Sequence, residues 1–482
     1  MPRRHIHVTG AAEDLRAALR ELRTRMQVPV SFPPAVLAEA EAAAAAPRLP
    51  EYDATDIPFF TIDPPGSRDL DQAMHLARRP GGGYRVHYAI ADVAAFVTAG
   101  GALDKEAHRR VETLYFPDEK IPLHPPVLSE GAASLLPDQT APALLWRFDL
   151  DADGYQVDVD VRRARVRSIL RLDYAGAQQQ IEAGTAEEPL ALLKTVGTLR
   201  EALEVERGGV SLELPEQEVV EAGNSYTLVY RAPRPVDGWN EQISLLTGMA
   251  AADLMIGAGT GVLRTLGAAP DGVERLRRSA QALEIDWPHH LSYAELIRSL
   301  DPADNPRHAA FLMDAATGLF EKSAYLHFEG GHLPDSMVHS AIADEYTHCT
   351  APLRRLVDRY VGELCLAAVA GQAPPAWVTD ALAALPADME RGRGKDADRQ
   401  SMDVVEAALL KDRIGQVFDG FVIDVRDSAG RKGVVHLKDP AVVGTVKSQQ
   451  RLKEGTPVKA KLTKADPADP DRDKVLFEHV PE

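Results

Sequence analysis

The chain has 482 residues, enough for two to four domains and a large hydrophobic core. Its formal net charge of −18 argues against a uniformly basic nucleic-acid-binding surface, although a channel that grips RNA needs basic residues only locally. The two cysteines, Cys349 and Cys365, give no disulfide framework, and the sequence shows neither an apolar run of about 18 residues nor a signal-peptide pattern. We therefore expect a cytoplasmic protein that does not enter a membrane.

Residues 1–50 predict two short helices. Apolar residues recur on one face of a segment from about residue 11 to 26, and an alanine-rich segment follows at 35–46. Pro29, Pro33 and Pro34 separate the two segments. Such a pair could form a helix-turn-helix-like module or an arm that docks on the rest of the protein, and the docking arm is the simpler interpretation.

An acidic stretch from Thr61 to Ala73 is the strongest chemical signal in the sequence. Asp63, Asp69 and Asp71 fall within nine positions, and Gln72 adds an amide oxygen. The apolar run before them predicts a buried strand, while the Pro-Pro-Gly at 64–66 predicts a turn that folds the chain back. Carboxylates held close together repel one another unless a cation lies between them, and oxygen ligands suit Mg²⁺ or Mn²⁺. A solvated acidic turn is the alternative.

The remaining pattern predicts an α+β catalytic domain over 51–412. Short apolar runs separated by turn residues indicate a sheet-rich part from 53 to about 160, with some helix near 104–112. Helical spacing and alanine content dominate from 173 to 205 and from 240 to 385. We expect a mixed sheet surrounded by helices, with the acids at strand ends.

Residues 413–482 predict a second domain made of five short strands. This segment resembles the ribosomal-protein-type OB-fold, a five-stranded RNA-binding β-barrel. Residues 411–482 hold 14 Lys and Arg against 12 Asp and Glu, a local net charge of +2 within an acidic protein. The residues predicted to contact RNA here are Phe418, Phe421, His436, Lys459 and Lys461. For either phenylalanine, packing in the core is an equally good interpretation.

The motifs, taken in order, resemble those of the RNase II (RNB) family of exoribonucleases. The acidic stretch resembles the family signature, whose usual form is close to T-I-D-P-x-x-A-x-D-L-D-D-A. Further matches follow at Val86–Val93, Tyr115–Pro117, Ile121–Leu123 and Tyr346-Thr-His-Cys-Thr-Ala-Pro-Leu-Arg-Arg355. Relatives usually carry two cold-shock domains before the catalytic block, whereas the 50 residues before it here are too few for one such barrel. A less screened entrance would let the enzyme enter duplex regions more readily.

The resemblance assigns metal binding to Asp63, Asp69, Asp71 and Gln72, and catalysis to Asp69, Asp71 and Arg354. Gln72 stands where the family usually has aspartate, so we expect one metal site to be weaker. Arg354 matches an arginine that contacts the scissile phosphate, and Asp358, four residues further on, could orient it. Arg355 is read as a supporting phosphate contact or a surface ion-pair residue.

Two tyrosines and one serine complete the comparison with the family. Tyr115 and Tyr174 resemble tyrosines that contact RNA, although a buried structural tyrosine is the alternative for each. Ser401 stands where the family has a glutamate, whose role is either missing here or filled by Asp403 or Glu406. Ala351 and Leu356 depart from the usual serine and tyrosine, so the likeness is looser in this segment.

The resemblance implies a Mg²⁺-dependent, processive 3′→5′ exoribonuclease that hydrolyses single-stranded RNA to 5′-nucleoside monophosphates and a short end product. We expect it to act as a monomer. One alternative is a catalytically weak RNA-binding protein that keeps the fold. Another is a hydrolase of small phosphoesters, which leaves the OB domain without a role. The four histidines at 327, 332, 339 and 348, with Cys349, fit no standard zinc pattern.

Overall fold

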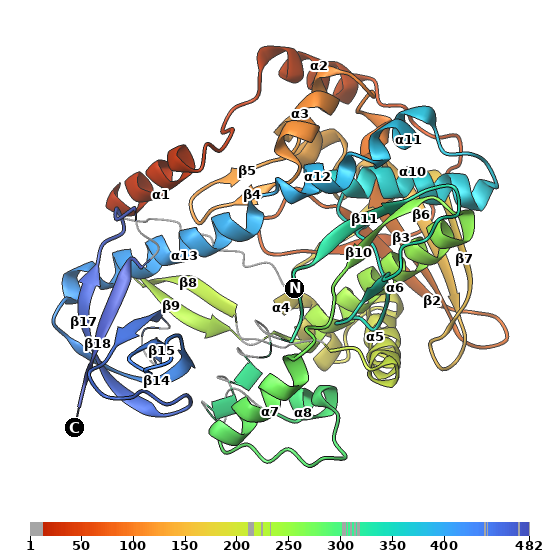
Figure 1. Ribbon diagram of the computed structural model, residues 1–482. Coiled ribbons are helices and arrows are strands. Elements are labelled where there is room, and N and C mark those ends of the chain that lie inside the picture. The colour runs from red at the N-terminus through yellow and green to blue at the C-terminus, as the bar shows by residue number, and fades with distance from the viewer. Residues whose placement is uncertain are drawn as a thin grey trace.

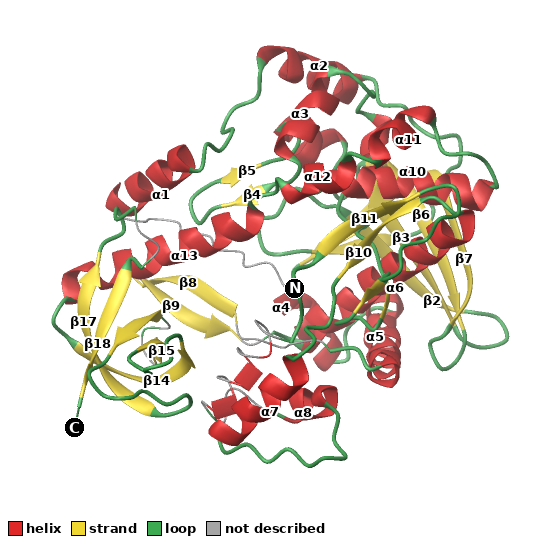
Figure 2. Ribbon diagram, in the orientation of Figure 1, coloured by secondary structure: helices red, strands yellow, loops and turns green. Residues whose placement is uncertain are grey.

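The computed structural model describes residues 13–481 except 211–215, 223–224, 232, 301–304, 306, 309–310, 313–314, 316–318, 438–439, 441 and 471–472. Two β-barrels, each at one side of the molecule, are joined by helices (Figure 1). Figure 2 shows the same view by secondary structure and makes the α+β character plain, as the sequence predicts. No described helix is long and apolar enough to cross a membrane.

The larger domain is built around a closed barrel with strand order β1-β2-β3-β6-β7. Strands β1 and β7 pair in parallel, and the other neighbours pair antiparallel. All residues of β1 are buried, which confirms the strand predicted before the acidic stretch. The strands are β1 (Phe59–Ile62), β2 (Gln72–Arg78), β3 (Tyr84–Ala91), β6 (Thr140–Leu150) and β7 (Gln156–Leu172).

Helices cover this barrel and share its core. The largest hydrophobic cluster joins barrel residues such as Trp146 and Phe148 to residues of α5, α6 and α10, including Leu193, Ile243 and Tyr360. The helices of this domain are α3 (Ala102–Arg110), α4 (Tyr174–Glu182), α5 (Glu188–Arg207), α6 (Pro235–Ala258), α7 (Gly272–Ala282), α8 (Tyr293–Ser299), α10 (Leu356–Ala370), α11 (Ala376–Leu382) and α12 (Leu385–Glu390). Short 3₁₀ and π turns lie at η1 (Val93–Ala95) and η2 (Leu128–Ala132).

The expected helical stretch from 240 to 385 is interrupted by strands. α6 ends at Ala258 and is capped by Gly259, whose φ of 73° lies in the left-handed region that favours glycine, and β10 begins two residues after this glycine. β10 pairs antiparallel with β11 across almost sixty residues of sequence, a partnership that local periodicity cannot reveal. The strands outside the barrels are β4 (Leu114–Tyr115), β5 (Lys120–Ile121), β8 (Glu216–Ala222), β9 (Ser225–Arg231), β10 (Gly261–Thr265), β11 (Ala324–Phe328), β12 (Val338–His339) and β13 (Asp344–Glu345).

The C-terminal segment forms the predicted five-stranded closed barrel, in the order β14-β15-β16-β18-β17. Side chains of β17 alternate between exposed and buried, which gives this strand one face to the barrel interior and one to solvent. The strands are β14 (Val417–Val425), β15 (Lys432–Leu437), β16 (Val443–Lys447), β17 (Pro457–Ala465) and β18 (Val475–Val480). Helix α13 (Gly394–Leu410) and the turn η3 (Lys411–Arg413) lead into the barrel.

The two N-terminal helices, α1 (Glu13–Arg25) and α2 (Pro34–Ala45), pack in different places. Leu15, Leu19 and Leu22 of α1 belong to a cluster with α13, the β4–β5 hairpin and the C-terminal barrel. Val36 and Ala40 of α2 belong to a separate cluster on the larger domain. Figure 1 shows α1 alongside α13 and α2 beside α3, so the helices run along the surface as an arm rather than packing together as one module.

Candidate functional site

The acidic stretch leaves one barrel strand and enters the next. Asp63 follows β1, and its backbone N–H continues the pairing with β7 by donating to the Leu172 carbonyl at 3.1 Å. Gly66, with a φ of 83°, turns the chain, and Ser67 N–H closes the turn on the Pro64 carbonyl at 3.1 Å. The chain then returns through Asp69 and Asp71 into β2. The acids therefore lie on a short loop fixed at both ends by the barrel.

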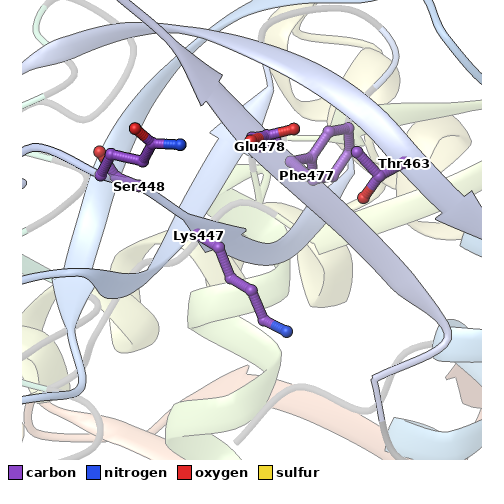
Figure 3. Close-up of a pocket in the computed structure, with 6 residues that line it drawn as sticks. Lys447, Ser448, Thr463, Phe477 and Glu478 are labelled. Carbon is purple, nitrogen blue, oxygen red and sulfur yellow. The ribbon is translucent and has the colours of Figure 1, made fainter.

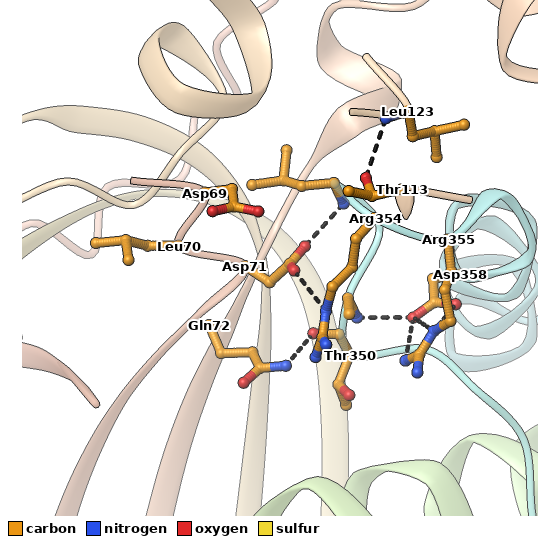
Figure 4. Close-up of polar contacts among 12 residues, drawn as sticks. Asp69, Leu70, Asp71, Gln72, Thr113, Leu123, Thr350, Arg354, Arg355 and Asp358 are labelled. Atoms are coloured by element: carbon orange, nitrogen blue, oxygen red, sulfur yellow. Dashed lines mark hydrogen bonds and ion pairs between the residues drawn. The ribbon is translucent and has the colours of Figure 1, made fainter. Parts of the chain in front are cut away.

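Asp71 is buried and bound on both carboxylate oxygens by the loop before α10. Its Oδ1 accepts from Leu353 N–H at 2.7 Å, and its Oδ2 accepts from Arg354 Nε at 3.1 Å (Figure 4). The Asp71 side chain is 5% exposed, and that of Arg354 is 24% exposed. Burial raises the pKa of Asp71 above its usual range, and Arg354 opposes that shift. The two predicted catalytic residues thus meet in one buried ion pair.

Gln72 also contacts this loop. Its Nε2 donates to the backbone carbonyl of Thr350 at 2.5 Å, and Figure 4 shows the side chain reaching toward that residue. The amide therefore fastens the start of β2 to the segment that carries Arg354. The Thr350 hydroxyl lies 2.8 Å from the Ser244 hydroxyl of α6, which links the same loop to the helical layer.

Asp63 has a buried carboxylate oxygen, Oδ2, without a hydrogen-bond partner. Burial raises the pKa of Asp63 to about 7; Arg354 opposes the shift, and the charge of Asp69 adds to it. Tyr174 begins α4 two residues after Leu172, whose carbonyl accepts from Asp63 N–H, so this tyrosine lies near the acids. Burial raises the pKa of Tyr174, and the charge of Asp63 adds to that rise. The Tyr174 hydroxyl accepts from Asn240 Nδ2 at 3.3 Å.

Asp69 is held by the β4–β5 hairpin. Lys120 Nζ lies 2.9 Å from Asp69 Oδ1 and 2.7 Å from Glu130 Oε1. The Tyr115 hydroxyl donates to Asp69 Oδ2 at 3.3 Å. The structure thus places the predicted RNA contact Tyr115 against an acid of the candidate site, where Lys120 supplies a positive charge.

The donor chemistry of these residues fits a divalent metal. Three carboxylates and an amide oxygen are ligands that Mg²⁺ and Mn²⁺ accept, and the unpartnered Asp63 Oδ2 is a buried acceptor that such an ion could satisfy. Among the described residues, however, no three Asp, Glu, His or Cys side chains already converge on one point. Arg354 and Lys120 instead neutralise Asp71 and Asp69.

The position of Arg355 differs from two predictions, the phosphate or surface role of Arg355 and the pairing of Asp358 with Arg354. The Arg355 guanidinium pairs with Asp358 at 2.8 Å, and the two side chains are 13% and 0% exposed. Asp358 also accepts from Ala351 N–H at 2.7 Å, so it orients Arg355 and the loop rather than Arg354. Figure 4 shows the two arginines turned toward different acids. Arg355 is therefore neither a surface residue nor a guanidinium left open for phosphate, because its charge is already paired in the interior.

The aromatic predictions in the C-terminal barrel also need correction. Phe418 and Phe421 are each 5% exposed and lie in hydrophobic clusters, so neither ring presents a face to a base. The His436 ring packs edge-on against Phe421, with ring centroids 4.8 Å apart. Burial lowers the pKa of His436 to about 4, so at neutral pH it carries no positive charge toward a phosphate. Phe418 faces the barrel interior, whereas Phe421 lies on the outer face of the barrel, paired with His436 across the strands and buried against residues of α7 and α8.

Lys459 and Lys461 lie on the exposed face of β17, alternating with the buried Val458, Ala460 and Leu462. Lys459 Nζ pairs with Asp419 of β14 at 2.5 Å, and both side chains are more than half exposed. A pocket of about 220 Å³ opens on the same barrel, lined by residues of β16, β17 and β18 that include Lys447 and Glu478 (Figure 3).

Asp403 and Glu406, the two candidates to replace the family glutamate, lie where α13 packs against the C-terminal barrel. Ser401 is buried in α13. Glu406 Oε1 accepts from the backbone N–H of Val443 in β16 at 3.1 Å. Asp403 lies near Lys474 of the same barrel, where its charge partly offsets the lowering of the Lys474 pKa by burial. Glu406 is thus not the missing catalytic acid.

Sequence reasoning missed Lys120 and Glu130. Both lie between motifs that the sequence does reveal, and Lys120 directly precedes the matched Ile121–Leu123 segment. Its role depends on the pairing of Tyr115 with Lys120 in the hairpin, which brings both side chains to Asp69. A lone lysine beside an acidic residue in sequence carries no such signal.

Comparison with known proteins agrees with this arrangement. The RNB domain family model matches residues 51–371, and the model for the RNase II-type exonuclease C-terminal S1 domain matches residues 416–480. Ribonuclease R of Aquifex aeolicus is 27% identical over 468 residues, which cover 92% of this chain and 64% of that protein. The chain thus spans less than two thirds of that relative's length.

Solved structures share the fold. Mycoplasma genitalium RNase R in complex with ribose-methylated single-stranded RNA superposes with a TM-score of 0.83 at 19% identity, covering 97% of this chain and 78% of that one. Yeast Ssd1, described as a pseudonuclease, superposes with a TM-score of 0.66 at 16% identity, covering 88% and 52%. Since the RNB model covers more than half of the sequence, this chain belongs to the RNB family, with an RNase II-type S1 domain at its C-terminal end.

Proposed function

We propose that the protein is a divalent-metal-dependent 3′→5′ exoribonuclease that processively hydrolyses single-stranded RNA to 5′-nucleoside monophosphates and a short end product. The observation that carries the proposal is the buried junction of Asp71 and Arg354 beside Asp63 and Asp69. It joins the two segments that match the family most specifically, 283 positions apart. Membership of the RNB family supports the reaction type.

Asp63, Asp69, Asp71 and Gln72 would hold the metal, Mg²⁺ or Mn²⁺. When bound, such an ion supplies an activated water and neutralises phosphate charge. Asp71 holds Arg354 through Nε, and a guanidinium has two further nitrogens that can donate to the oxygens of the scissile phosphate. Arg354 would therefore stabilise the charge that develops on the phosphate, while Asp71 fixes its direction.

RNA would meet two parts of the protein. Tyr115 and Tyr174 lie at the acids, where a tyrosine ring can stack on any base and so suits a nuclease without sequence preference. Lys459 and Lys461 lie on the C-terminal barrel, where they would contact the backbone of the incoming strand. We propose single-stranded RNA as the substrate, and RNA with duplex regions as a further one, for a monomeric enzyme in the cytoplasm.

Digestion of 5′-labelled oligo(A) tests the proposal. Wild type is expected to run down to a short labelled product in Mg²⁺ and to stop in EDTA. Asp71→Asn keeps the shape of the side chain and its acceptor for Leu353 N–H but removes the charge, and should lower the rate by at least about 100-fold while RNA binding persists. Asp56→Asn, at an exposed aspartate before β1, is the control and should leave the rate unchanged.

A catalytically weak RNA-binding protein is the second candidate. Gln72 in place of an acid, and the neutralisation of Asp69 and Asp71 by Lys120 and Arg354, favour it. The fold shared with a protein described as a pseudonuclease shows that the architecture alone does not require activity. Wild type that binds oligo(A) but leaves it intact across a range of Mg²⁺ and Mn²⁺ concentrations would select this candidate. Activity on a small phosphoester but not on oligo(A) would select neither.

A further inference from the structure

Lys120 lies at the candidate metal site without a role in the function proposed above. Its Nζ bridges two acids, at 2.9 Å from Asp69 Oδ1 and 2.7 Å from Glu130 Oε1. The hairpin that carries it also directs the Tyr115 hydroxyl to Asp69 Oδ2, so one short element contacts both oxygens of this carboxylate. The ammonium group of Lys120 therefore contacts Asp69, which is one of the expected metal ligands.

Binding of a divalent metal ion and of the Lys120 ammonium to the same Asp69 carboxylate is electrostatically unfavourable. A divalent ion on this carboxylate would lie beside the Lys120 ammonium, and like charges repel strongly where water is partly excluded. The Asp69 side chain is 13% exposed and that of Lys120 is 24% exposed, so solvent screens the repulsion only in part.

Glu130 is a second ion-pair partner for Lys120. It lies in η2, outside the acidic loop, and its side chain is 26% exposed. A lysine has four flexible methylene groups, so its ammonium can move toward Glu130 without any change in the backbone. Since Lys120 already touches both acids, the movement needed to release Asp69 is small.

We propose that Lys120 is a built-in competitor of the divalent metal, which neutralises Asp69 in the metal-free protein and withdraws to Glu130 when a metal binds. The inference rests on the proposed metal site and concerns how that site is regulated. Lys120 raises the metal concentration that the site requires and keeps the acids paired when metal is scarce. Glu130 acts in the opposite direction, because it stabilises the withdrawn lysine.

Binding of Mn²⁺ to the RNA-free protein, measured from the electron paramagnetic resonance signal of the free ion, tests this without any turnover. Lys120→Met removes the competing charge and keeps the length of the side chain, so we expect Mn²⁺ to bind roughly tenfold tighter than to wild type. Glu130→Gln removes the alternative partner, so we expect weaker binding. Asp69→Asn should abolish the gain produced by Lys120→Met.

Lys120→Arg is the matched control, since it keeps the charge and should not tighten binding. If Lys120→Met unfolds, as judged by circular dichroism, the comparison of Glu130→Gln with wild type still tests the inference. Glu130→Gln should bind Mn²⁺ more weakly than wild type does. Equal or weaker Mn²⁺ binding by folded Lys120→Met, or unchanged binding by Glu130→Gln, would overturn the inference while leaving a metal-dependent nuclease intact. If wild type and all variants fail to bind Mn²⁺, the metal site itself fails, and the inference with it.

Discussion

Arg354 Nε donates to Asp71 Oδ2 at 3.1 Å, and the neighbouring Leu353 N–H donates to the other oxygen of the same carboxylate at 2.7 Å. Two adjacent groups of one loop thus fix an acid at the start of a barrel strand. A charge buried in this way is stable only while its partner remains. The Asp71–Arg354 pair therefore contributes both to the stability of the fold and to the arrangement of the candidate site.

Arg354→Met should destabilise the protein by about 3 kcal/mol, because it leaves the buried Asp71 carboxylate unpaired. Adding Asp71→Asn to it should recover part of that loss, since the double variant contains no unpaired charge. Urea unfolding of the wild type, both single variants and the double variant measures the coupling. Strictly additive losses would show that the ion pair has no energetic role.

Gln72→Glu should destabilise the metal-free protein by about 1–3 kcal/mol, because it replaces the amide donor to the Thr350 carbonyl with a carboxylate. Mn²⁺ should restore more stability to this variant than to wild type, since the new charge favours a cation. Melting temperatures in EDTA and in Mn²⁺ measure both effects. Gln372→Glu, at an exposed position, is the control and should behave as wild type in both solutions.

Lys459→Gln and Lys461→Gln should each weaken RNA binding to a similar extent for any sequence. Each lysine that contacts a phosphate releases about one counterion, so the slope of log affinity against log salt should fall by about one per substitution. Fluorescence anisotropy with labelled oligo(A) and oligo(U) at several salt concentrations measures this. Lys105→Gln, at an exposed position on α3, should leave the slope unchanged. If all three variants have the same salt slope, the lysines of β17 do not contact the RNA backbone.

The C-terminal barrel should lose stability in mild acid through His436. Burial lowers its pKa to about 4, whereas an unfolded histidine titrates near 6.5. The unfolded state therefore binds a proton first, and the stabilisation is lost as the pH falls from about 6.5 to 4, by roughly 3 kcal/mol in all. His436→Gln should flatten unfolding free energy against pH in that window. Parallel curves for wild type and variant would contradict the shift.

The sequence predicts most of the architecture and part of the site. The apolar run at 57–62, the turn at 64–66 and the alternation along the C-terminal strands are local patterns, and each is confirmed. The β10–β11 pair escaped prediction because its two strands meet only through the tertiary fold. The same cause explains why the partner of Asp358 is Arg355: helical spacing made Arg354 available, but the loop before α10 turns Arg354 toward Asp71.

Burial was the main property that sequence motifs could not supply. Phe418 and Phe421 have the right residue type for stacking, but Phe418 fills the interior of the small barrel and Phe421 is covered by α7 and α8 on its outer face. Lys120 is the converse case. It belongs to no motif, yet the hairpin register places it on a predicted ligand.

The cluster that contains Leu19 of α1, Phe116 of the hairpin, Val405 of α13 and Phe418 of the C-terminal barrel is one continuous apolar core. A boundary at residue 412 therefore separates two sequence families but cuts through a shared interior. The C-terminal barrel cannot be removed without exposing the face of α13 that packs on it, and α13 also packs on the hairpin that holds Tyr115 and Lys120.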